Sequence, residues 1–374
     1  MTSTLYVSTF APTLGSGRAL RTYTCVKALA SLDAVDLLYT PHGGDPAPEF
    51  EVMEGLELHR VDSSRGLRRA AFYASKRVRG VPDTFARGVH PELLDATRQL
   101  LENRGHERIV AGDLSAAAIL LPLSRSWPIT YNAHNVLTAY ERSPAAPSHF
   151  AYALASAFER RLLSRAVESW MVSELDMEAA RRLAASARLR YVPNVVDVKA
   201  IEPVPARALP GRALLMVGDF LYEPNRAGRS FLVEEIMPAI WRHAPDVRLT
   251  LVGRGLESWE APDPRIEVAG FVEDLAGAYR RCDCVVVPIR EGGGTPLKFV
   301  EALAYGIPVV ATPFAARGLT AVGGRHYREA SDCVSFADAV LSVLEDGAGE
   351  MAASGRALAE SSYSVEALAR LIAA

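Results

Sequence analysis

Short apolar runs alternate with longer amphipathic stretches along the chain, and this alternation limits the fold more than any other feature. A short apolar run is typical of a buried strand, and a longer amphipathic stretch is typical of a covering helix. Because strand and helix alternate, neighbouring strands are expected to run parallel. The predicted strands are residues 5–9, 35–39, 56–60, 108–111, 129–132 and 168–172, then 213–217, 248–252, 266–269, 284–288 and 308–311. The predicted helices include residues 18–32, 91–103 and 145–166, then 226–244, 273–280, 296–304 and 336–344.

Residues 202–211 divide these strands into two series. The stretch contains three prolines and a glycine, which continue neither a helix nor a central strand. A chain of 374 residues is long enough for two domains with separate cores. We therefore predict an α/β protein with two doubly wound, Rossmann-like parallel-sheet domains, at residues 1–201 and 212–360, joined by the linker 202–211. Ligands of such domains bind beyond the carboxyl ends of the strands, so two domains facing each other are expected to form a cleft.

The charge balance and the apolar pattern exclude several classes of protein. Lys and Arg number 41 against 44 Asp and Glu, so the overall charge of -3 gives no reason to expect nucleic-acid binding. No apolar run reaches the roughly 18 residues that span a bilayer, and the first residues lack the basic start of a signal peptide. We expect a cytoplasmic protein whose 4 cysteines form no disulfide framework. Cys282 and Cys284 are predicted to enter a buried strand rather than to form half of a metal site.

The most informative segment is a glycine-rich loop between a strand and a helix. Gly292, Gly293 and Gly294 follow the predicted strand 284–288, and the helix is expected to begin with Thr295 as its N-cap and Pro296 as its first residue. Consecutive glycines let the backbone approach a ligand closely, and a helix N-terminus presents free N–H groups and a positive dipole end. The segment is neither a Gly-x-Gly-x-x-Gly loop nor a Walker A loop. The alternative is an ordinary glycine-rich turn without a ligand.

Two charged residues on this helix extend the prediction to a nucleotide. Lys298 lies on the first turn, where its ammonium can reach the same anion as the helix N-terminus. Glu301 lies one turn further on, where its carboxylate can accept hydrogen bonds from vicinal hydroxyls such as those of a ribose. Diphosphate and ribose binding from one helix predicts a nucleotide ligand.

At this segment the sequence resembles the donor-site signature of retaining glycosyltransferases of family 4, which have the GT-B fold. The resemblance begins with Glu-Gly-Gly-Gly-Thr-Pro-Leu-Lys-Phe-Val-Glu-Ala at Glu291 and continues with Gly-Ile-Pro-Val-Val-Ala-Thr at Gly306. Shorter segments agree in the expected order and extend the resemblance over nearly the whole chain. They are Gly15-Ser-Gly17 with Arg21, Ala133-His-Asn-Val136, Val192-Pro-Asn-Val-Val-Asp197, Met216-Val-Gly-Asp-Phe220 with Pro224-Asn225, Leu251-Val-Gly-Arg-Gly255 and Gly270-Phe-Val-Glu-Asp274.

The resemblance implies roles for individual residues. Glu301 corresponds to the second glutamate of the family's Glu-x7-Glu pair and would hold the ribose, whereas Gly293 stands where the first glutamate would bind the donor sugar. Whether Glu291 replaces that glutamate is left open. The predicted catalytic residues are Lys298 and His134. The predicted donor-binding residues are Gly15, Gly17, Gly218, Arg226, Glu291, Gly292, Gly293, Gly294, Thr295, Lys298 and Glu301.

Several residues of the first domain have a structural alternative. His134 follows the predicted strand 129–132 and is as well explained by a structural role as by substrate contact. Gly15 and Gly17 are either a tight turn or amides that bind the diphosphate. Arg21 is either a cleft residue or a surface charge, and Asn194 with Asp197 is a turn or hinge before it is a ligand contact.

Residues 65–79, from Arg65 to Arg79, form a basic amphipathic stretch. Leu67, Ala70, Ala71, Ala74 and Val78 fall on one helical face, and basic residues occupy the others. Such a helix can lie on an anionic membrane or meet a phosphate-bearing acceptor. The alternative is a solvated helix packed on the first domain.

We therefore expect a retaining glycosyltransferase that moves a sugar from a nucleoside diphosphate sugar to an acceptor hydroxyl. The donor is a substrate, and neither a cofactor nor a metal is expected, because no Asp-x-Asp motif lies in a suitable loop. The acceptor is a small molecule, a glycan or a lipid-linked compound, and membrane contact through residues 65–79 would be peripheral and at the inner face. The fold resemblance also implies that residues 1–201 bind the acceptor, that residues 212–360 bind the nucleotide-sugar donor, and that residues 361–374 return to the first domain as a helix. The alternatives are a non-catalytic nucleotide-sugar-binding subunit and a related GT-B enzyme such as an epimerase or a pseudo-glycosyltransferase.

Overall fold

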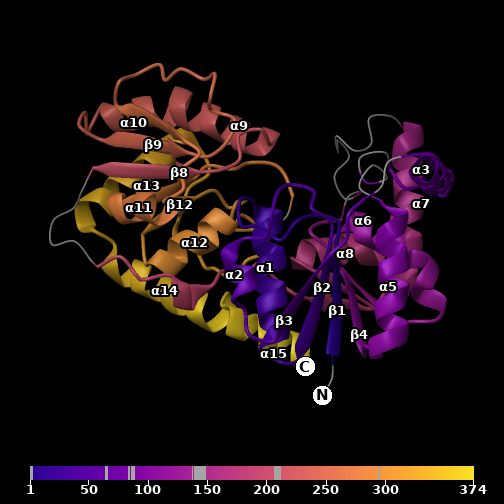
Figure 1. The fold of residues 1–374 in the computed structure, drawn as a ribbon. Coiled ribbons are helices and arrows are strands. Elements are labelled where there is room, and N and C mark those ends of the chain that lie inside the picture. The colour runs from indigo at the N-terminus through magenta and orange to yellow at the C-terminus, as the bar shows by residue number, and fades with distance from the viewer. Residues whose placement is uncertain are drawn as a thin grey trace. The chain divides into compact units, whose positions relative to one another are not determined.

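The computed structural model describes residues 3–63, 66–82, 85, 89–136, 138, 149–205, 212–293 and 295–374. The chain divides into two compact units, unit 1 (Met1–Pro193 with Leu368–Ala374) and unit 2 (Asn194–Ala367). The linker predicted at residues 202–211 lies outside the described residues from position 206 onward. Figure 1 shows the elements of both units.

Unit 1 is built on a parallel sheet with helices on both faces. Its described residues give a 7-stranded sheet in the order β3-β2-β1-β4-β5-β6-β7. The strands are β1 (Ser3–Ser8), β2 (Ala34–Tyr39), β3 (Leu56–Arg60), β4 (Arg108–Ala111), β5 (Ile129–Asn132), β6 (Glu168–Met171) and β7 (Leu189–Tyr191). The helices are α1 (Gly17–Ala30), α2 (Pro48–Glu51), α3 (Leu67–Val78), α5 (Pro91–Arg104), α6 (Leu114–Leu120), the 3-10 turn η1 (Leu121–Arg125), α7 (His149–Arg165) and α8 (Glu174–Leu183).

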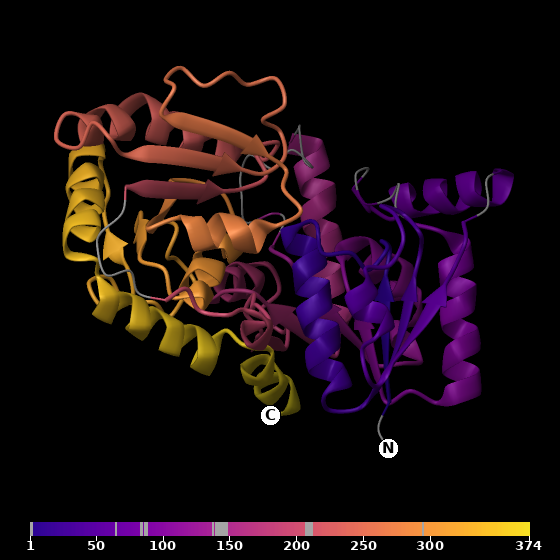
Figure 2. The same ribbon diagram turned by 60° about the vertical axis from the view of Figure 1, so that its left-hand side comes forward.

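The core of unit 1 follows from the two-residue period of its strands. Leu5 and Val7 of β1 point into the core cluster that α5, α6, α7 and α8 cover. Tyr6 points to the other face, where its hydroxyl accepts a hydrogen bond of 2.9 Å from Nδ2 of Asn132. Figures 1 and 2 show α1 and α5 on opposite sides of this sheet. Both faces are therefore covered, as a parallel sheet requires.

Unit 2 repeats this architecture. In the part of the unit that is described, a 6-stranded parallel sheet has the order β10-β9-β8-β11-β12-β13. Its strands are β8 (Ala213–Val217), β9 (Arg248–Val252), β10 (Ile266–Gly270), β11 (Cys284–Val287), β12 (Val309–Ala311) and β13 (Arg328–Glu329). Its helices are the 3-10 turn η3 (Val198–Ala200), α9 (Glu223–Phe231), the π-helix η4 (Leu232–Ile236), α10 (Met237–Trp241), α11 (Leu275–Arg281), α12 (Leu297–Tyr305), α13 (Cys333–Asp346), α14 (Gly349–Ser362) and α15 (Val365–Ala373), whose last residues belong to unit 1.

The predicted fold class is confirmed, with corrections at particular elements. The helix expected at residues 226–244 consists of α9, η4 and α10. Helix α12 begins at Leu297 with Pro296 as its N-cap, so the prediction that Thr295 caps this helix was wrong. The helix ends at Gly306, whose φ of +68° suits a left-handed C-cap, and Pro308 then leads into β12.

Gly253 lets two strand ends of unit 2 meet. It follows β9, has a φ of +143°, and its N–H donates to Gly270 O at 2.7 Å. A Cβ at this position would lie 1.7 Å from Gly218 O, which follows β8. Any side chain would therefore force the two strand ends apart.

We expect Gly253→Ala to lower the free energy of unfolding by about 3 kcal/mol or more, because it adds both backbone strain and a clash with the Gly218 carbonyl. Gly349→Ala is the matched control, since Gly349 begins α14 and a Cβ there would meet nothing within 4 Å. Chemical denaturation of both variants tests this. Equal stabilities would contradict the close approach of the two strand ends.

Candidate functional site

The predicted donor residues of unit 2 lie where the strand order of its sheet reverses. The chain runs from β8 outward to β9 and β10 and then returns to the other side of β8 as β11. Ligands of open parallel sheets bind at this reversal, beyond the carboxyl ends of the strands. Gly218 follows β8 here, and the glycine loop lies between β11 and α12.

The glycine loop packs closely against the start of α9. Gly292 has a φ of +115°, and a Cβ at this position would lie 2.8 Å from Cγ of Pro224. The N–H of Gly293 donates to the hydroxyl of Tyr222 at 3.2 Å. This approach requires glycine at position 292. Gly294 lies outside the described residues.

Lys298 lies close to the loop after β8. Its Nζ donates a hydrogen bond of 2.5 Å to Oδ1 of Asn225, and the Asn225 amide donates in turn to Asp219 O at 2.8 Å. A Cβ at Gly218 would lie 3.2 Å from the Lys298 ammonium. Burial lowers the pKa of Lys298 to about 8, against the opposing effect of Glu301. The ammonium is therefore held close to the Gly218 backbone, where no side chain separates the two.

Glu301 is held by an aromatic residue of the preceding helix. The hydroxyl of Tyr279 on α11 donates to Oε2 of Glu301 at 2.9 Å, and the Tyr279 ring stacks on Tyr305 with centroids 4.5 Å apart. Burial raises the pKa of the Glu301 carboxyl, although the Tyr279 hydrogen bond and the Lys298 charge act the other way. The carboxylate is thus oriented before any ligand binds.

The remaining predicted donor residues of unit 2 have other contacts. Thr295 is buried, and its hydroxyl accepts a hydrogen bond of 3.0 Å from Nδ2 of Asn194. Arg226 pairs with Glu223 one turn earlier on α9. Glu291 is exposed. The structure therefore associates Lys298, Asn225 and Gly218 directly, whereas Arg226 and Glu291 have no place in that group.

In unit 1, the structure gives the burial and the hydrogen bonds of two predicted residues, Arg21 and His134. Arg21 is buried, and its Nη2 and Nη1 donate to Asn132 Oδ1 at 2.6 Å and to Val192 O at 3.0 Å, so the surface-charge alternative was wrong. His134 Nε2 lies 3.0 Å from Gly112 O, and since a carbonyl only accepts, Nε2 must carry the hydrogen. Burial lowers the pKa of His134 to about 3. His134 is therefore neutral, with Nδ1 as an acceptor.

Gly15 and Gly17 are exposed and lie at the start of α1. Ser16 between them caps this helix, because its Oγ accepts from the N–H of Ala19 at 3.2 Å. A Cβ at Gly15 would meet nothing within 4 Å. The turn alternative explains their positions, and diphosphate binding by their amides stays a prediction.

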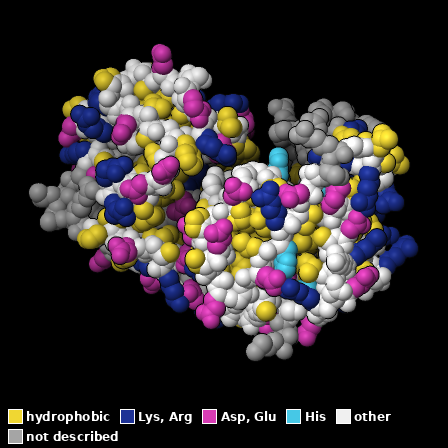
Figure 3. Space-filling view, in the orientation of Figure 1, with side chains coloured by type: hydrophobic (Ala, Val, Ile, Leu, Met, Phe, Trp, Pro, Cys, Tyr) yellow, Lys and Arg dark blue, Asp and Glu magenta, His cyan; other side chains and the backbone are white. Residues whose placement is uncertain are grey.

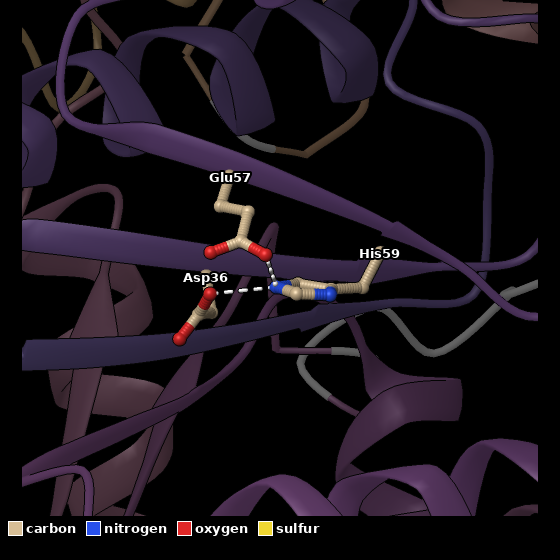
Figure 4. Close-up of side chains that lie close together, drawn as sticks. All are labelled: Asp36, Glu57 and His59. Atoms are coloured by element: carbon tan, nitrogen blue, oxygen red, sulfur yellow. Dashed lines mark hydrogen bonds and ion pairs between the residues drawn. The ribbon is translucent and has the colours of Figure 1, made fainter. Parts of the chain in front are cut away.

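A cluster of carboxylates and imidazoles lies on β2 and β3. Figure 4 shows Asp36, Glu57 and His59, whose ligand atoms lie within 4.8 Å of one another, a spacing that could hold a metal ion. Arg104 of α5 already bridges the carboxylates, since its Nη1 lies 2.6 Å from Asp36 Oδ1 and 2.6 Å from Glu57 Oε2. His106 Nε2 lies 2.6 Å from the second Asp36 oxygen. The Arg104 guanidinium therefore takes the place that a metal cation would have between these carboxylates, and the cluster has a structural role.

No disulfide bond joins any of the four cysteines. Cys284 is the first residue of β11, and its side chain is fully buried. The only group of potential metal ligands that the described residues form is the Asp36 cluster. The prediction that Cys282 and Cys284 enter a buried strand is confirmed for Cys284, while Cys282 is the C-cap of α11.

The glycosyl transferases group 1 family matches residues 211–346, which include the loop after β8, the glycine loop and α12. The match covers most of unit 2, which is therefore similar to a glycosyl transferases group 1 domain. Phosphatidyl-myo-inositol mannosyltransferase of Mycobacterium leprae is 28% identical over 205 residues, which cover 50% of this chain and 52% of that protein. The enzyme of the same name from Mycolicibacterium smegmatis is 28% identical over 202 residues, 50% of each chain. The chain thus spans about half the length of the curated relatives it matches.

Solved structures of low identity share the fold. Sucrose-phosphate synthase from Thermosynechococcus elongatus has a TM-score of 0.73 at 19% identity and covers 100% of this chain and 98% of its own. Anabaena Alr3699/HepE in complex with UDP-glucose has a TM-score of 0.71 at 15% identity with the same coverage. The predicted GT-B fold is confirmed by these structures, and the family match over residues 211–346 agrees with the predicted resemblance.

Two residues of the site were not predicted from the sequence. Tyr279 lies in a stretch correctly predicted as helix, but nothing in its neighbourhood signals a hydrogen bond to Glu301. Tyr222 lies two residues before Pro224, which the family resemblance did single out together with Asn225. That segment was the available signal for Tyr222 and for the role of Asn225.

We expect Asp36→Asn to lower the free energy of unfolding by about 1–3 kcal/mol at pH 7, because it leaves His106 and Arg104 with a poorer buried acceptor. Burial raises the pKa of Asp36, but hydrogen bonds from His106 and His59 and the charge of Arg104 outweigh it and lower the pKa below its usual value. The stabilisation is therefore complete above the unfolded pKa of about 3.9 and is lost as pH falls through the folded pKa. Denaturation at pH 7 and near pH 3 measures this, and a difference that grows on acidification would contradict it.

Proposed function

We propose that the protein is a retaining glycosyltransferase that moves a sugar from a nucleoside diphosphate sugar to an acceptor hydroxyl. One observation carries the proposal. Helix α12 brings Lys298 and Glu301, both fixed by neighbouring side chains, to the strand-order reversal of the group 1 domain. A cation and a carboxylate on one helix N-terminus match a diphosphate followed by a ribose.

Lys298 is proposed to bind the diphosphate through its ammonium. At pH 7 a group with a pKa of about 8 is mostly protonated, and an approaching diphosphate favours the charged form further. Asn225 keeps the ammonium in place, since its own amide is fixed by Asp219 O. Glu301, held by Tyr279, is proposed to accept the ribose hydroxyls through its oxygens.

In this reaction the protein mainly stabilises charge that develops on the substrate, and little covalent chemistry is required of its side chains. The bond from the anomeric carbon to the diphosphate oxygen breaks, and a bond from that carbon to the acceptor oxygen forms on the same face. The acceptor proton goes to a departing phosphate oxygen. Lys298 and the N–H groups at the start of α12 would stabilise the charge that develops on the diphosphate.

His134 is proposed to orient a substrate hydroxyl and not to remove its proton. Its Nε2–H is committed to Gly112 O, which leaves Nδ1 to accept one hydrogen bond. A pKa of about 3 makes the imidazole a weak base. This supports proton transfer to the leaving phosphate.

The names of similar proteins support the substrate class. The Anabaena structure contains UDP-glucose, and the mycobacterial relatives are named as mannosyltransferases that act on phosphatidyl-myo-inositol. We therefore propose a nucleotide sugar as donor and place a lipid-linked compound first among the acceptors. Gly293 at the position of the family's first glutamate, with Glu291 exposed, favours a non-catalytic nucleotide-sugar-binding subunit as the second candidate.

We expect Lys298→Ala to lower affinity for a nucleoside diphosphate ten- to a hundredfold while leaving affinity for the nucleoside nearly unchanged. The lost contact is a charge-assisted hydrogen bond worth about 1.5–3 kcal/mol. Glu301→Gln should weaken both ligands equally, because the ribose is common to them. Calorimetry with both ligands on both variants measures this.

Lys199→Ala is the matched control, since Lys199 is exposed and pairs with Glu366 in the same unit. The unaltered protein should also lose diphosphate affinity as pH rises above about 8, because the Lys298 ammonium deprotonates there. That pH dependence should disappear in Lys298→Ala. Equal losses of nucleoside and diphosphate in this variant would remove Lys298 from the phosphate site.

We also propose that α3 contacts a membrane surface. The apolar face of the predicted amphipathic helix is exposed: Leu67 is 90% exposed and Val78 89%, and Ala70, Ala71 and Ala74 between them are exposed as well. Figure 3 shows hydrophobic side chains on the surface over α3, with Lys and Arg beside them.

Helix α3 packs on unit 1 through Phe72 and Tyr73. The packed-helix alternative expected the apolar face with Leu67 and Val78 to be buried, but that face does not pack on unit 1. Arg68 and Arg77 flank the exposed face and are themselves exposed. An apolar face between exposed arginines fits an anionic bilayer surface. None of the helices that the structure describes is long and apolar enough to span a bilayer, so the proposed contact is peripheral.

We expect the protein to sediment with phosphatidylglycerol vesicles and not with phosphatidylcholine vesicles, and less so at high salt. The double variant Leu67→Glu with Val78→Glu should abolish this binding, because it places two charges on the apolar face. Val52→Glu, at a position 83% exposed in the same unit, should not. Equal binding by both variants would contradict a role for α3.

A further inference from the structure

Tyr222 places a side-chain hydroxyl at the glycine loop of unit 2. The residue lies in the loop after β8 and is the N-cap of α9. Its hydroxyl oxygen accepts a hydrogen bond of 3.2 Å from the N–H of Gly293, which lies 71 residues further along the chain. The same oxygen would lie 3.0 Å from a Cβ at Gly292. The phenol therefore lies against the backbone of two consecutive glycines.

The backbone of Tyr222 is held by hydrogen bonds at both its N–H and its carbonyl. The N–H donates to Asp219 O at 3.1 Å, and the carbonyl accepts from the N–H groups of Asn225 and Arg226 at 3.1 and 3.2 Å. Asn225 is also the residue that accepts a hydrogen bond from the Lys298 ammonium. The loop that holds Tyr222 is thus the loop that positions Lys298.

The Tyr222 hydroxyl is accessible and has its own hydrogen to donate. The residue is 47% exposed, and because Gly293 N–H is the donor in their contact, the phenol oxygen is the acceptor there. A phenolic hydroxyl can accept one hydrogen bond and donate another. Within the part of the chain that the structure describes, no acceptor for the Tyr222 hydrogen is found. A ligand oxygen at the glycine loop can therefore accept it.

The order of groups along α12 indicates which part of a ligand lies beside Tyr222. Glu301 lies one turn after Lys298, and the glycine loop precedes both. In the proposed function Glu301 binds the ribose and Lys298 binds the diphosphate. A nucleoside diphosphate sugar joins its parts in the order ribose, diphosphate and sugar. The sugar is therefore expected on the glycine-loop side of the diphosphate, where the Tyr222 hydroxyl lies.

The described residues of the glycine loop have little to donate to a sugar from their own side chains. Gly292 and Gly293 carry none, and Thr295 is buried. Glu291 is exposed, and an ionised carboxylate only accepts hydrogen bonds. A side-chain donor to a sugar oxygen at this loop must therefore come from a neighbouring segment, and Tyr222 supplies one.

We propose that Tyr222 is a specificity-determining residue that donates a hydrogen bond to an oxygen of the donor sugar. The inference rests on the proposed function, because that function gives the order of ribose, diphosphate and sugar along α12. The Gly293 N–H fixes the phenol oxygen, and accepting this bond makes the hydroxyl a stronger donor. A group that bonds only to the sugar distinguishes a nucleotide sugar from the bare nucleoside diphosphate.

Calorimetry on the full chain with UDP, UDP-glucose, GDP and GDP-mannose measures the contribution of the sugar. Each pair that the unaltered protein binds is measured again on Tyr222→Phe, which removes the hydroxyl and keeps the ring. Affinity for the nucleotide sugar should fall about three- to tenfold, which is the loss of one hydrogen bond. Affinity for the matching nucleoside diphosphate should stay the same, because Lys298 and Glu301 are intact.

Tyr327→Phe is the matched control, since the Tyr327 hydroxyl donates to Glu329 at 2.6 Å in the same unit, at β13. It should leave the affinity for both ligands unchanged, and thermal unfolding of each variant shows that it is folded. Equal losses of nucleotide sugar and diphosphate in Tyr222→Phe would overturn the proposal, because a role in shaping the loop would then explain them.

Glu291→Gln tests the competing residue of the loop. A selective loss of nucleotide-sugar affinity in Glu291→Gln, with none in Tyr222→Phe, would also overturn the proposal and assign the sugar contact to Glu291. Failure of the proposed function would be visible separately. In that case the unaltered protein would bind neither nucleoside diphosphate, and the role of Tyr222 would be overturned with it.

Discussion

The parallel arrangement of every paired strand is the constraint on which the candidate site depends. A parallel strand pair needs a crossover, so each sheet collects all its carboxyl ends at one edge, and a reversal in strand order opens a gap between the loops there. In unit 1 the reversal lies between β1 and β4, where Arg18 and His134 line a pocket. In unit 2 it lies between β8 and β11, where Gly218 and Lys298 meet. Topology alone therefore brings together residues far apart in the chain.

The proposed donor site combines a rigid backbone with two charged groups whose burial costs free energy. Gly253 and Gly292 allow contacts that any side chain would prevent, which fixes the loops around Lys298. Burial makes the Lys298 ammonium and the Glu301 carboxylate less favourable, and the shifted pKa values of both groups reflect this. Asn225 and Tyr279 offset part of that cost and hold the two groups in position. In the proposed function a diphosphate and a ribose would supply the remaining partners, and the fixed positions of the two groups would preorganise the site for them.

Most of the strands could be predicted from the sequence, because a buried parallel strand consists of a continuous run of apolar residues. Arg108–Ala111, Ile129–Asn132, Ala213–Val217 and Arg248–Val252 have the predicted bounds. β7 and β13 were missed, since their residues are half-buried or exposed and form no apolar run. Local sequence predicted that Lys298 and Glu301 share a helix, but the Tyr279 bond depends on the packing of α11 against α12. The role of Arg21 could not be predicted from the sequence either, because its partner Asn132 lies 111 residues further along the chain.

The release of nucleoside diphosphate from a panel of nucleotide sugars tests the central claim most directly. The purified full chain would be incubated with each donor, with and without phosphatidylglycerol vesicles and phosphorylated polyols as acceptors. The account predicts that at least one donor is converted, with nucleoside diphosphate released in equal amount to the transferred or hydrolysed sugar, and that Lys298→Ala suppresses this release. A donor that binds tightly but is never cleaved would contradict a transferase and indicate a binding subunit. Release that Lys298→Ala leaves unchanged would contradict the proposed site.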